Sequence, residues 1–362
     1  MKRFFSIFLA VLFIVMSIPF AFALNYEGFV LNKDDKGNYV ITECKIFSDS
    51  IINVPESVNG IPVTAIGSGA FRSKPNIYSV TIPDSVTSIG SMAFMGCKNL
   101  TDIEIGEGVT SIGAKAFSSC SSLSSIDVKN TTMIGEYVFA GCKSLGSFSA
   151  ESSLKIIGRS AFEGCASLDY VNLGDALVYI DKLAFSGCES LQEIFFPDTL
   201  AFIGERAFSG CTSLSDVHIG SGELQIEAYA FENCSSLSEI TIPDNVTSIG
   251  ENAFAVTNTE NLDVAYYVTI CCNKNSPVMP YVKASNVSVY IMDEDVTISV
   301  FGDMNGNGEV DTEDAATALD ITAGIEVNNL SDYEMFLYDL DCNNAIDTDD
   351  VILMLKKAAN VA

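Results

Sequence analysis

Two acidic segments of twelve residues lie near the C-terminal end of this 362-residue sequence, and their residue types suit metal chemistry. The first runs from Asp303 to Asp314 and the second from Asp339 to Asp350. Side-chain oxygens occupy positions 1, 3, 5, 9 and 12 of both segments, and position 7 offers a backbone carbonyl. This spacing is typical of a loop that wraps one Ca²⁺ ion with oxygen ligands. The sequence therefore predicts two calcium sites.

The predicted ligands follow from the loop positions. Those of the first ion are Asp303, Asn305, Asn307, Glu309 through its carbonyl, Asp311 and Asp314. Those of the second ion are Asp339, Asp341, Asn343, Ala345 through its carbonyl, Asp347 and Asp350. Position 12 is Asp in both loops, whereas an EF-hand carries the longer Glu there, so these are not ordinary EF-hands. Each loop continues into an amphipathic stretch, 312–323 and 348–359, which predicts two loop–helix units without a leading helix.

These units resemble the type I dockerin module of cellulosomal proteins. The family pattern, G-D-x-N-x-[DN]-G-x-[VI]-[DN]-x-x-D, matches residues 302–314 closely, and the second copy departs from it at Tyr338, Asp341 and Asn344. The resemblance covers residues 302–360. It implies a small α domain with two calcium loop–helix motifs, whose partner is a cohesin module of a scaffoldin. A calcium-stabilised tail without a partner is the alternative.

The same resemblance implies which residues contact the cohesin. In that family the residues just before loop position 12 form contacts, and basic residues further along the second helix contribute. The corresponding cohesin-binding residues of this sequence are Thr312, Glu313, Thr348, Asp349, Lys356 and Lys357.

The first 23 residues have the pattern of a secretory signal peptide. Lys2 and Arg3 give a positive start, residues 4–20 are almost wholly apolar, and residues 21–23 form an A-x-A cleavage site. An uncleaved membrane anchor is the alternative. No later apolar run is long enough to cross a bilayer. We therefore expect a secreted, extracellular protein with no membrane span, and the dockerin resemblance implies a place in a bacterial cell-surface complex.

The middle of the chain repeats an apolar pattern every 23 residues, with one step of 22. A period of 20 to 29 residues is typical of a leucine-rich solenoid, whose neighbouring coils must stack to bury their apolar faces. The segment L-x-x-I-x-I has apolar residues at period two, which predicts a short strand. The sequence therefore predicts an α/β leucine-rich repeat solenoid, a right-handed coil of about nine repeats and about 40 Å long. The repeated Phe residues are at positions 71, 94, 117, 139, 162, 185, 208, 231 and 254.

The full repeat, I-P-D-S-V-T-S-I-G-x-x-A-F-x-G-C-x-S-L, resembles the BspA-type leucine-rich repeats of bacterial surface and secreted proteins. The resemblance implies adhesion or the binding of host or matrix proteins, although solenoid architecture alone fixes no ligand. It also implies an N-terminal cap and a closing cap of a strand, a short helix and a strand. The expected organisation is a signal peptide at 1–23, an N-terminal cap at 24–62, repeats with a C-terminal cap at 63–291, a linker at 292–301 and the dockerin at 302–360.

Seven of the eleven cysteines occupy one slot of the repeat. A Cys at the same place in successive coils predicts a ladder of buried, small apolar side chains. Ladder side chains point in parallel rather than toward each other, so we expect reduced thiols. A ladder of disulfides or metal ligands is the alternative. The seven are Cys97, Cys120, Cys142, Cys165, Cys188, Cys211 and Cys234.

Composition and motifs exclude several classes of function. A net charge of −28 argues against nucleic acid or anionic lipid as partners, because phosphate binding needs clustered Lys and Arg. The sequence has one His, no phosphate loop and no G-x-S-x-G elbow, so we expect a non-catalytic binding or adhesion protein. A carbohydrate-active enzyme or accessory (an O-glycosyl hydrolase) of polysaccharide breakdown stays open, because its two acids need no fixed spacing. A docked peptidase inhibitor also stays open.

Ligand binding is expected at the outward positions of the strand row. Tyr170, Asn172, Phe195 and His218 come from three successive coils and are predicted to face one side. Clustered exposed aromatic residues are the usual anchors of protein or sugar recognition. The alternative is that aromatic residues simply suit strands. The expected ligand is a protein or a polysaccharide, and the sequence does not distinguish them.

Overall fold

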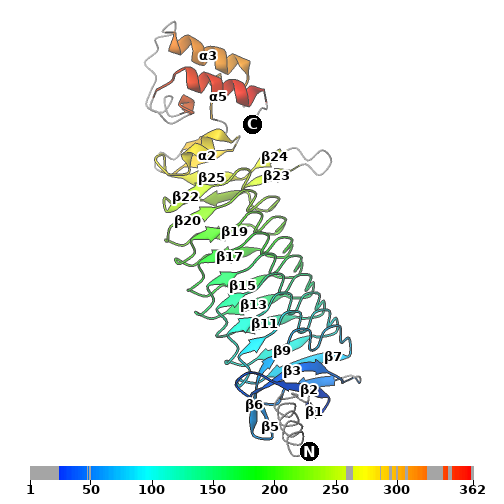
Figure 1. Cartoon of the computed structure of the whole chain (residues 1–362). Coiled ribbons are helices and arrows are strands. Elements are labelled where there is room, and N and C mark those ends of the chain that lie inside the picture. The colour runs from blue at the N-terminus through cyan, green and yellow to red at the C-terminus, as the bar shows by residue number, and fades with distance from the viewer. Residues whose placement is uncertain are drawn as a thin grey trace, which may run out of the picture.

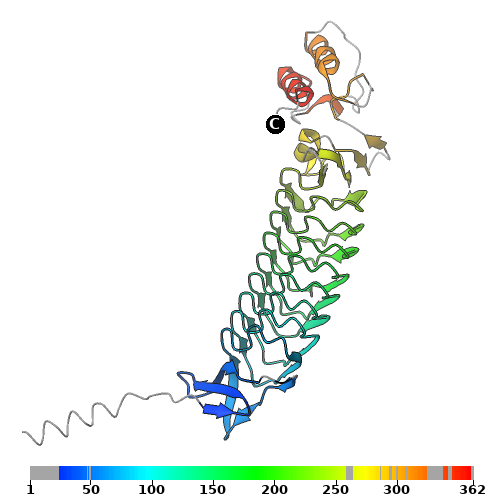
Figure 2. The same ribbon diagram turned by 90° about the vertical axis from the view of Figure 1, so that its right-hand side faces the viewer.

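The computed structural model describes residues 24–46, 48, 50–257, 264–285, 287–292, 296–298, 301–305, 309–323, 337–340 and 345–359. The described residues form an elongated stack of coils, with the N-terminal strands at one end and helices α3 and α5 at the other (Figures 1 and 2). The predicted repeat solenoid is confirmed. The signal peptide predicted at 1–23 lies outside the described residues. Within them, no helix is both long and apolar enough to cross a membrane.

Most coils contribute one strand to each of two rows, and neighbouring coils pair in parallel. The first row consists of β4 (Ser50–Asn53), β7 (Ile77–Ile82), β9 (Asp102–Ile105), β11 (Ser125–Val128), β13 (Ser147–Ala150), β15 (Tyr170–Asn172), β17 (Glu193–Phe195), β19 (Asp216–His218) and β21 (Glu239–Thr241). The second row consists of β8 (Ser88–Ile89), β10 (Ser111–Ile112), β12 (Met133–Ile134), β14 (Ile156–Ile157), β16 (Tyr179–Ile180), β18 (Phe202–Ile203), β20 (Leu224–Ile226) and β22 (Val246–Ile249).

An N-terminal cap closes one end of the solenoid. Strands β1 (Leu24–Tyr26), β2 (Phe29–Lys33) and β3 (Tyr39–Cys44) form an antiparallel meander. Strand β6 (Ile61–Ile66) pairs with β3 in parallel and with β5 (Ser57–Val58) antiparallel. The second row continues from β6 through β8, so the cap and the coils share one sheet.

The C-terminal cap has the expected order of strand, short helix and strand. These elements are β25 (Thr269–Cys272), α2 (Met279–Ala284) and β26 (Val289–Ile291), and β25 continues the first row beside β21. A hairpin of β23 (Ala255–Thr257) and β24 (Val264–Tyr267) precedes them. The structure differs from the linker expected at 292–301: β27 (Val296–Ile298) pairs antiparallel with β26, and Phe301 is fully buried. Backbone pairing and burial therefore extend the cap into that segment.

A ladder of stacked phenylalanine rings forms the core. The rings of Phe162 and Phe185 lie 4.9 Å apart between centroids with an interplanar angle of 2°. The backbone N–H of Phe162 donates to the carbonyl of Ala184 in the next coil at 2.7 Å. Close approach also explains the Gly that directly follows strands β8, β10 and β22, because a Cβ at Gly90 would lie 2.7 Å from the Ser68 backbone nitrogen. The Phe slot of the repeat thus provides both ring stacking and a hydrogen bond between coils, and the Gly slot allows their close approach.

The cysteine ladder is buried and its thiols are free, as predicted. Each of the seven thiols donates to the carbonyl of a ladder Phe in the preceding coil, at 3.2 Å for Cys165 and Phe139. Burial raises the pKa of the Cys97 thiol to about 11 and that of Cys165 to about 12. The thiols are therefore protonated packing groups, and six of the seven Phe carbonyls that they bond also accept from the backbone N–H of the Cys three residues on.

A small helical region follows the cap. Helices α3 (Thr312–Thr322) and α5 (Thr348–Ala358) pack against each other. Their shared interior includes Ala318 and Met354, both fully buried. Gly302 has φ of +87°, and a Cβ there would lie 3.3 Å from a Leu340 methyl carbon, which explains why glycine occupies this position.

Candidate binding surface and C-terminal loops

The first strand row presents an acidic outward face. Its outward side chains alternate with buried ones, and from β9 to β21 none of these outward positions carries Lys or Arg. The pattern follows from the pleat, because residues two apart along a strand point to the same side. Six exposed carboxylates lie at these positions: Asp102, Glu104, Asp127, Glu193, Asp216 and Glu239.

The predicted aromatic residues lie on this face. Phe195 and His218 are paired across β17 and β19, with ring centroids 4.2 Å apart and an interplanar angle of 5°. The exposed fractions of the Tyr170 and Phe195 side chains are 56% and 55%. Asn172 is exposed, and its Oδ1 accepts a hydrogen bond from the Gly174 backbone at 3.1 Å. Phe195 and His218 thus touch, whereas Tyr170 and Asn172 come from the neighbouring strand β15.

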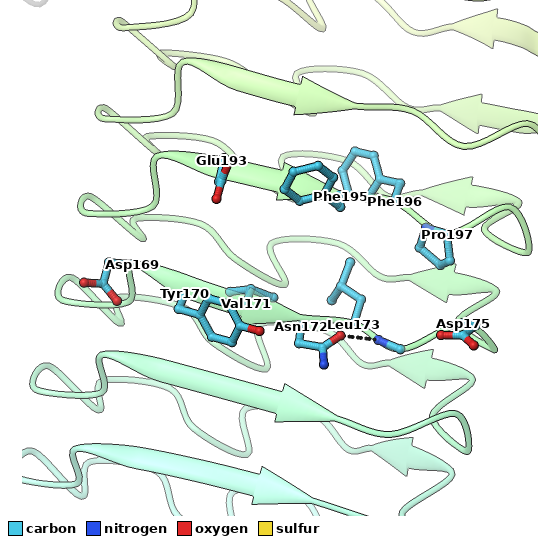
Figure 3. A pocket seen from close by; sticks show the side chains of 11 residues that line it. Asp169, Tyr170, Val171, Asn172, Leu173, Asp175, Glu193, Phe195, Phe196 and Pro197 are labelled. Carbon is cyan, nitrogen blue, oxygen red and sulfur yellow. Dashed lines mark hydrogen bonds between the residues drawn. The ribbon is translucent and has the colours of Figure 1, made fainter.

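An open hollow of about 380 Å³ lies between Tyr170 and Asn172 of β15 and Phe195 of β17. The first row is hydrogen-bonded within β11-β13-β15 and within β17-β19, and no backbone ladder joins β15 to β17 in the described chain. Figure 3 shows Asp169, Tyr170 and Asn172 on one side and Glu193 and Phe195 on the other. This hollow could not be predicted from the sequence, because the coil that contains it has the regular period.

A second apolar row, exposed at Met133 and Ile156 and half-buried at Tyr179 and Phe202, was not predicted from the sequence. It runs along the short strands through Met133, Ile156, Tyr179 and Phe202, which are paired in successive coils. The Tyr179 and Phe202 rings stack with centroids 4.7 Å apart at 2°. The corresponding residues of other coils are polar, namely Ser88, Ser111, Gln225 and Ser248. An alignment of the coils slot by slot would have revealed this row.

The two C-terminal loops close onto their helices in the same way. Asp311 caps α3 by accepting from the Glu313 backbone N–H at 2.7 Å, and its own N–H donates to Asp314 at 2.8 Å. Asp347 caps α5 through the corresponding bonds with Asp349 and Asp350. This reciprocal arrangement is a capping box, which satisfies backbone donors at a helix start.

Loop position 12 is fully buried in both copies. The Asp314 carboxylate also accepts from the backbone N–H groups of Met304 and Asn305, at 2.7 and 3.0 Å. The Asp350 carboxylate accepts from the Leu340 N–H at 2.6 Å. Each carboxylate therefore ties the start of its loop to the start of its helix. At position 12, where an EF-hand has Glu, the shorter Asp side chain makes these hydrogen bonds between loop and helix.

The predicted calcium ligands are only partly described. Asn307, Asp341 and Asn343 lie outside the described residues, whereas Asp303, Asn305, Glu309, Asp339 and Ala345 lie within them. Among the described residues, no group of three or more His, Cys, Asp or Glu side chains is arranged to hold a metal ion. The donor set itself consists of oxygen atoms, which fits a hard cation such as Ca²⁺.

Most of the predicted cohesin contacts lie on the surface. Thr312, Glu313, Thr348, Asp349 and Lys356 are exposed. The structure places Lys357 differently: it is partly buried, its Nζ donates to the Phe301 carbonyl at 3.2 Å, and burial lowers its pKa to about 8. Lys357 therefore contacts the segment that follows the solenoid cap rather than the solvent.

Exposed apolar residues on the helix pair were also missed. Leu319 of α3 and Leu355 of α5 occupy equivalent positions, 36 residues apart, and are 50% and 45% exposed. Ile352 of α5 is 47% exposed. Exposed large apolar side chains that recur at equivalent positions are typical of a contact surface.

Comparison with known proteins identifies the repeats. The model of the BspA type leucine rich repeat region matches residues 64–192 and 155–274, which together span more than half of the chain. A leucine rich cell surface protein of Faecalibacterium prausnitzii is similar in structure, with a TM-score of 0.53 and 23% identity over 71% of this chain and 89% of that one. A leucine rich repeat protein of T. pallidum gives a TM-score of 0.45 and 24% identity over 59% and 90%. No curated protein sequence matches the chain.

Proposed function

Because the chain belongs to the family of BspA type leucine-rich repeat proteins, we propose that it is an extracellular binding or adhesion protein whose solenoid recognises a protein ligand. The stacked pair of Phe195 and His218 carries the proposal. Stacking of the coils needs only the inward residues, so these large outward rings contribute little to the fold. The corresponding residue of an earlier coil is Ser149, which shows that a small polar side chain serves the fold there.

The charge of the same face favours a protein over a polysaccharide. Its outward carboxylates from β9 to β21 lack any neighbouring Lys or Arg in the row. Such a surface attracts a partner with a basic patch and steers its approach. A neutral polysaccharide gains nothing from this field. No observation favours the O-glycosyl hydrolase or the peptidase inhibitor, so neither is proposed.

A paired-variant binding experiment tests the proposal. The mature chain is screened against arrays of extracellular proteins and polysaccharides, and the strongest binder is titrated against F195S/H218S. We expect at least a tenfold loss of affinity for a protein ligand. The control is Y179S/F202S, which removes the half-buried ring stack of the second row and should bind like the wild type. Equal losses in both double variants, or binding to polysaccharides alone, would refute the proposal.

We infer further that the C-terminal helix pair binds two Ca²⁺ ions and attaches the protein to a cohesin module of a scaffoldin. Three features support this: the twelve-residue spacing, the matching capping boxes, and the exposed pair of Leu319 and Leu355. In this proposal Ca²⁺ neutralises part of a loop region that contains no Lys or Arg between residues 302 and 350. The residues that would hold the ions are the loop oxygens named above.

Calorimetry on the mature chain tests the calcium site directly. We expect two ions for each chain, and one ion for each of the variants D303N/D311N and D339N/D347N. The control D320N changes an exposed acid of α3 outside the loops and should leave the stoichiometry at two. A stoichiometry of zero for the unaltered chain would remove the calcium proposal, and with it the basis for docking.

A further inference from the structure

We propose that the hollow between β15 and β17 binds the side chain of an arginine from a basic segment of the protein ligand. This inference rests on the protein-binding function proposed above and names the chemistry that the site recognises. It draws on three independent features of the hollow: its place in the strand row, its aromatic walls and its charge.

The hollow lies at one of three places in the described first row where adjacent strands share no ladder, the others being β9–β11 and β19–β21. Strand β15 pairs with β13, and β17 pairs with β19, but β15 and β17 share no ladder. The coils remain tied by the core, where the Phe162 and Phe185 rings stack and the Phe162 N–H bonds to Ala184. The hollow of about 380 Å³ therefore opens on the outer face of coils whose cores stay stacked.

Aromatic rings form the walls of this space. His218 covers one face of the Phe195 ring, at 4.2 Å and nearly parallel. The other face borders the hollow, which Tyr170 lines from β15 (Figure 3). A flat group that enters the hollow can therefore lie against the free face of Phe195. Cations are attracted to such ring faces, and arginine is the side chain that most often uses them.

Carboxylates form the rim. Asp169 and Asp175 lie on the coil of β15, and Glu193 lies at the start of β17. All three are exposed, none forms an ion pair within the described chain, and no Lys or Arg is among the residues that line the hollow. A cation in the hollow therefore meets negative charge that no other group neutralises.

The combination selects guanidinium over other groups. Its planar, delocalised cation stacks on a ring and at the same time donates two parallel hydrogen bonds to one carboxylate. The lysine ammonium is a compact, strongly hydrated charge that cannot stack in this way. A sugar ring would use the aromatic wall but not the carboxylates. The geometry of walls and rim together thus favours arginine.

Three matched peptides provide the test, each with three repeats of X-Gly-Ser in which X is arginine, lysine or citrulline. Citrulline keeps the planar shape of arginine but lacks the charge. Titrated into the full mature chain at low salt, the arginine peptide should bind at least fivefold more tightly than the lysine peptide and at least tenfold more tightly than the citrulline peptide. Equal affinity for arginine and lysine would overturn the proposal, because general attraction to an acidic surface would then explain binding. Equal affinity for arginine and citrulline would overturn it as well.

Variants locate the site. Y170S and E193Q should each weaken arginine binding at least fivefold, whereas D127N, which removes one carboxylate from the same face two strands before β15, should change it less than twofold. Y170S introduces the residue that Ser147 supplies at the paired position of β13, so the fold tolerates it. Equal losses in all three variants would place the binding on the whole face instead of the hollow. If F195S/H218S loses the protein ligand but the chain shows no preference for the arginine peptide, only the proposed arginine site in the hollow fails. If F195S/H218S keeps the ligand, the proposed function fails.

Discussion

Lys283, near the C-terminal end of helix α2, donates a hydrogen bond from its buried Nζ to the backbone carbonyl of Asp339, the first residue of the second acidic loop. The same Nζ lies 5.8 Å from the centroid of the Phe301 ring. Lys357 of α5 approaches the Phe301 carbonyl as well. Two lysines thus connect the solenoid cap with the C-terminal helices through one short segment.

Replacement of Lys283 by Met should loosen this connection. The substitution keeps an unbranched side chain one atom shorter but leaves the Asp339 carbonyl without this donor, which costs about 1–3 kcal/mol. We expect the amides of α5 to exchange hydrogen about tenfold faster or more, and those of the solenoid coils to be unaffected. Lys356→Met is the matched control, because Lys356 is an exposed lysine of α5, the helix whose exchange is measured. Unchanged exchange in K283M would show that the two parts are held together by other contacts.

Truncation of a ladder ring should destabilise the solenoid. Phe162 is fully buried and contacts Phe139, Phe148 and Phe185, so Phe162→Ala removes stacking and leaves a cavity. The expected cost is about 3–5 kcal/mol in the free energy of unfolding, measured by chemical denaturation of the mature chain. Phe195→Ala provides the contrast, because that ring is exposed, and should cost less than about 1 kcal/mol. A small effect of F162A would contradict the role of the ladder as the core.

The buried thiols predict how stability depends on pH. An unfolded Cys loses its proton near pH 9, whereas burial keeps Cys97 and Cys165 protonated up to about 11 and 12. The folded state therefore binds more protons than the unfolded state in this window, so stability is fully present below pH 9 and falls as the pH rises through 11 to 12. Between its unfolded and its folded pKa, each such thiol lowers the free energy of unfolding by about 1.4 kcal/mol per pH unit. Denaturation at pH 8 to 11 should show this loss, and C97A/C165A should show a shallower one.

The same burial predicts slow chemical modification. In the native protein at pH 8, iodoacetamide should label Cys165 and Cys188 only after unfolding, because neither thiol is exposed or ionised. Cys271, which is partly exposed, should react first and serves as the internal control. Mass spectrometry of digested samples gives the extent at each site. Rapid native labelling of Cys165 would contradict the buried ladder.

The core was predictable because the repeat itself specifies it. Phe162 and Cys165 recur at fixed slots, and stacking brings equal slots of neighbouring coils into contact. The period therefore predicts the ladders, their burial and the strand row that carries Tyr170 and Phe195. The closing cap was implied by the resemblance to BspA-type repeats and not by the period itself.

Features that depend on departures from the repeat were not predictable. The hollow lies between β15 and β17, although Val171 and Ile194 keep the regular sequence pattern. Strand β27 is short and its partner β26 is antiparallel, so no periodic signal marks it. The inward path of Lys357 depends on Phe301 of a distant segment. Each of these features arises from long-range geometry that local residue types do not encode.

The two halves of the helix pair provide the last prediction, which concerns the proposed cohesin contact. Thr312 and Glu313 of α3 correspond to Thr348 and Asp349 of α5, and all four side chains are exposed. This near-equivalence would allow either half to face one cohesin. The halves differ further along, where α5 carries the exposed Lys356 and α3 carries Asp320.

We expect the second half to dominate, because Lys356 adds a positive charge where Asp320 adds a negative one. With Ca²⁺ present and a cohesin from the same organism as probe, T348A/D349A should weaken binding at least tenfold and T312A/E313A less than threefold. The matched pair K356D and D320K should shift the preference toward the first half. Equal losses in both double variants would indicate true dual binding. If no cohesin of that organism binds, the docking proposal fails, and a calcium-stabilised helical tail is the remaining explanation for the duplicated loops.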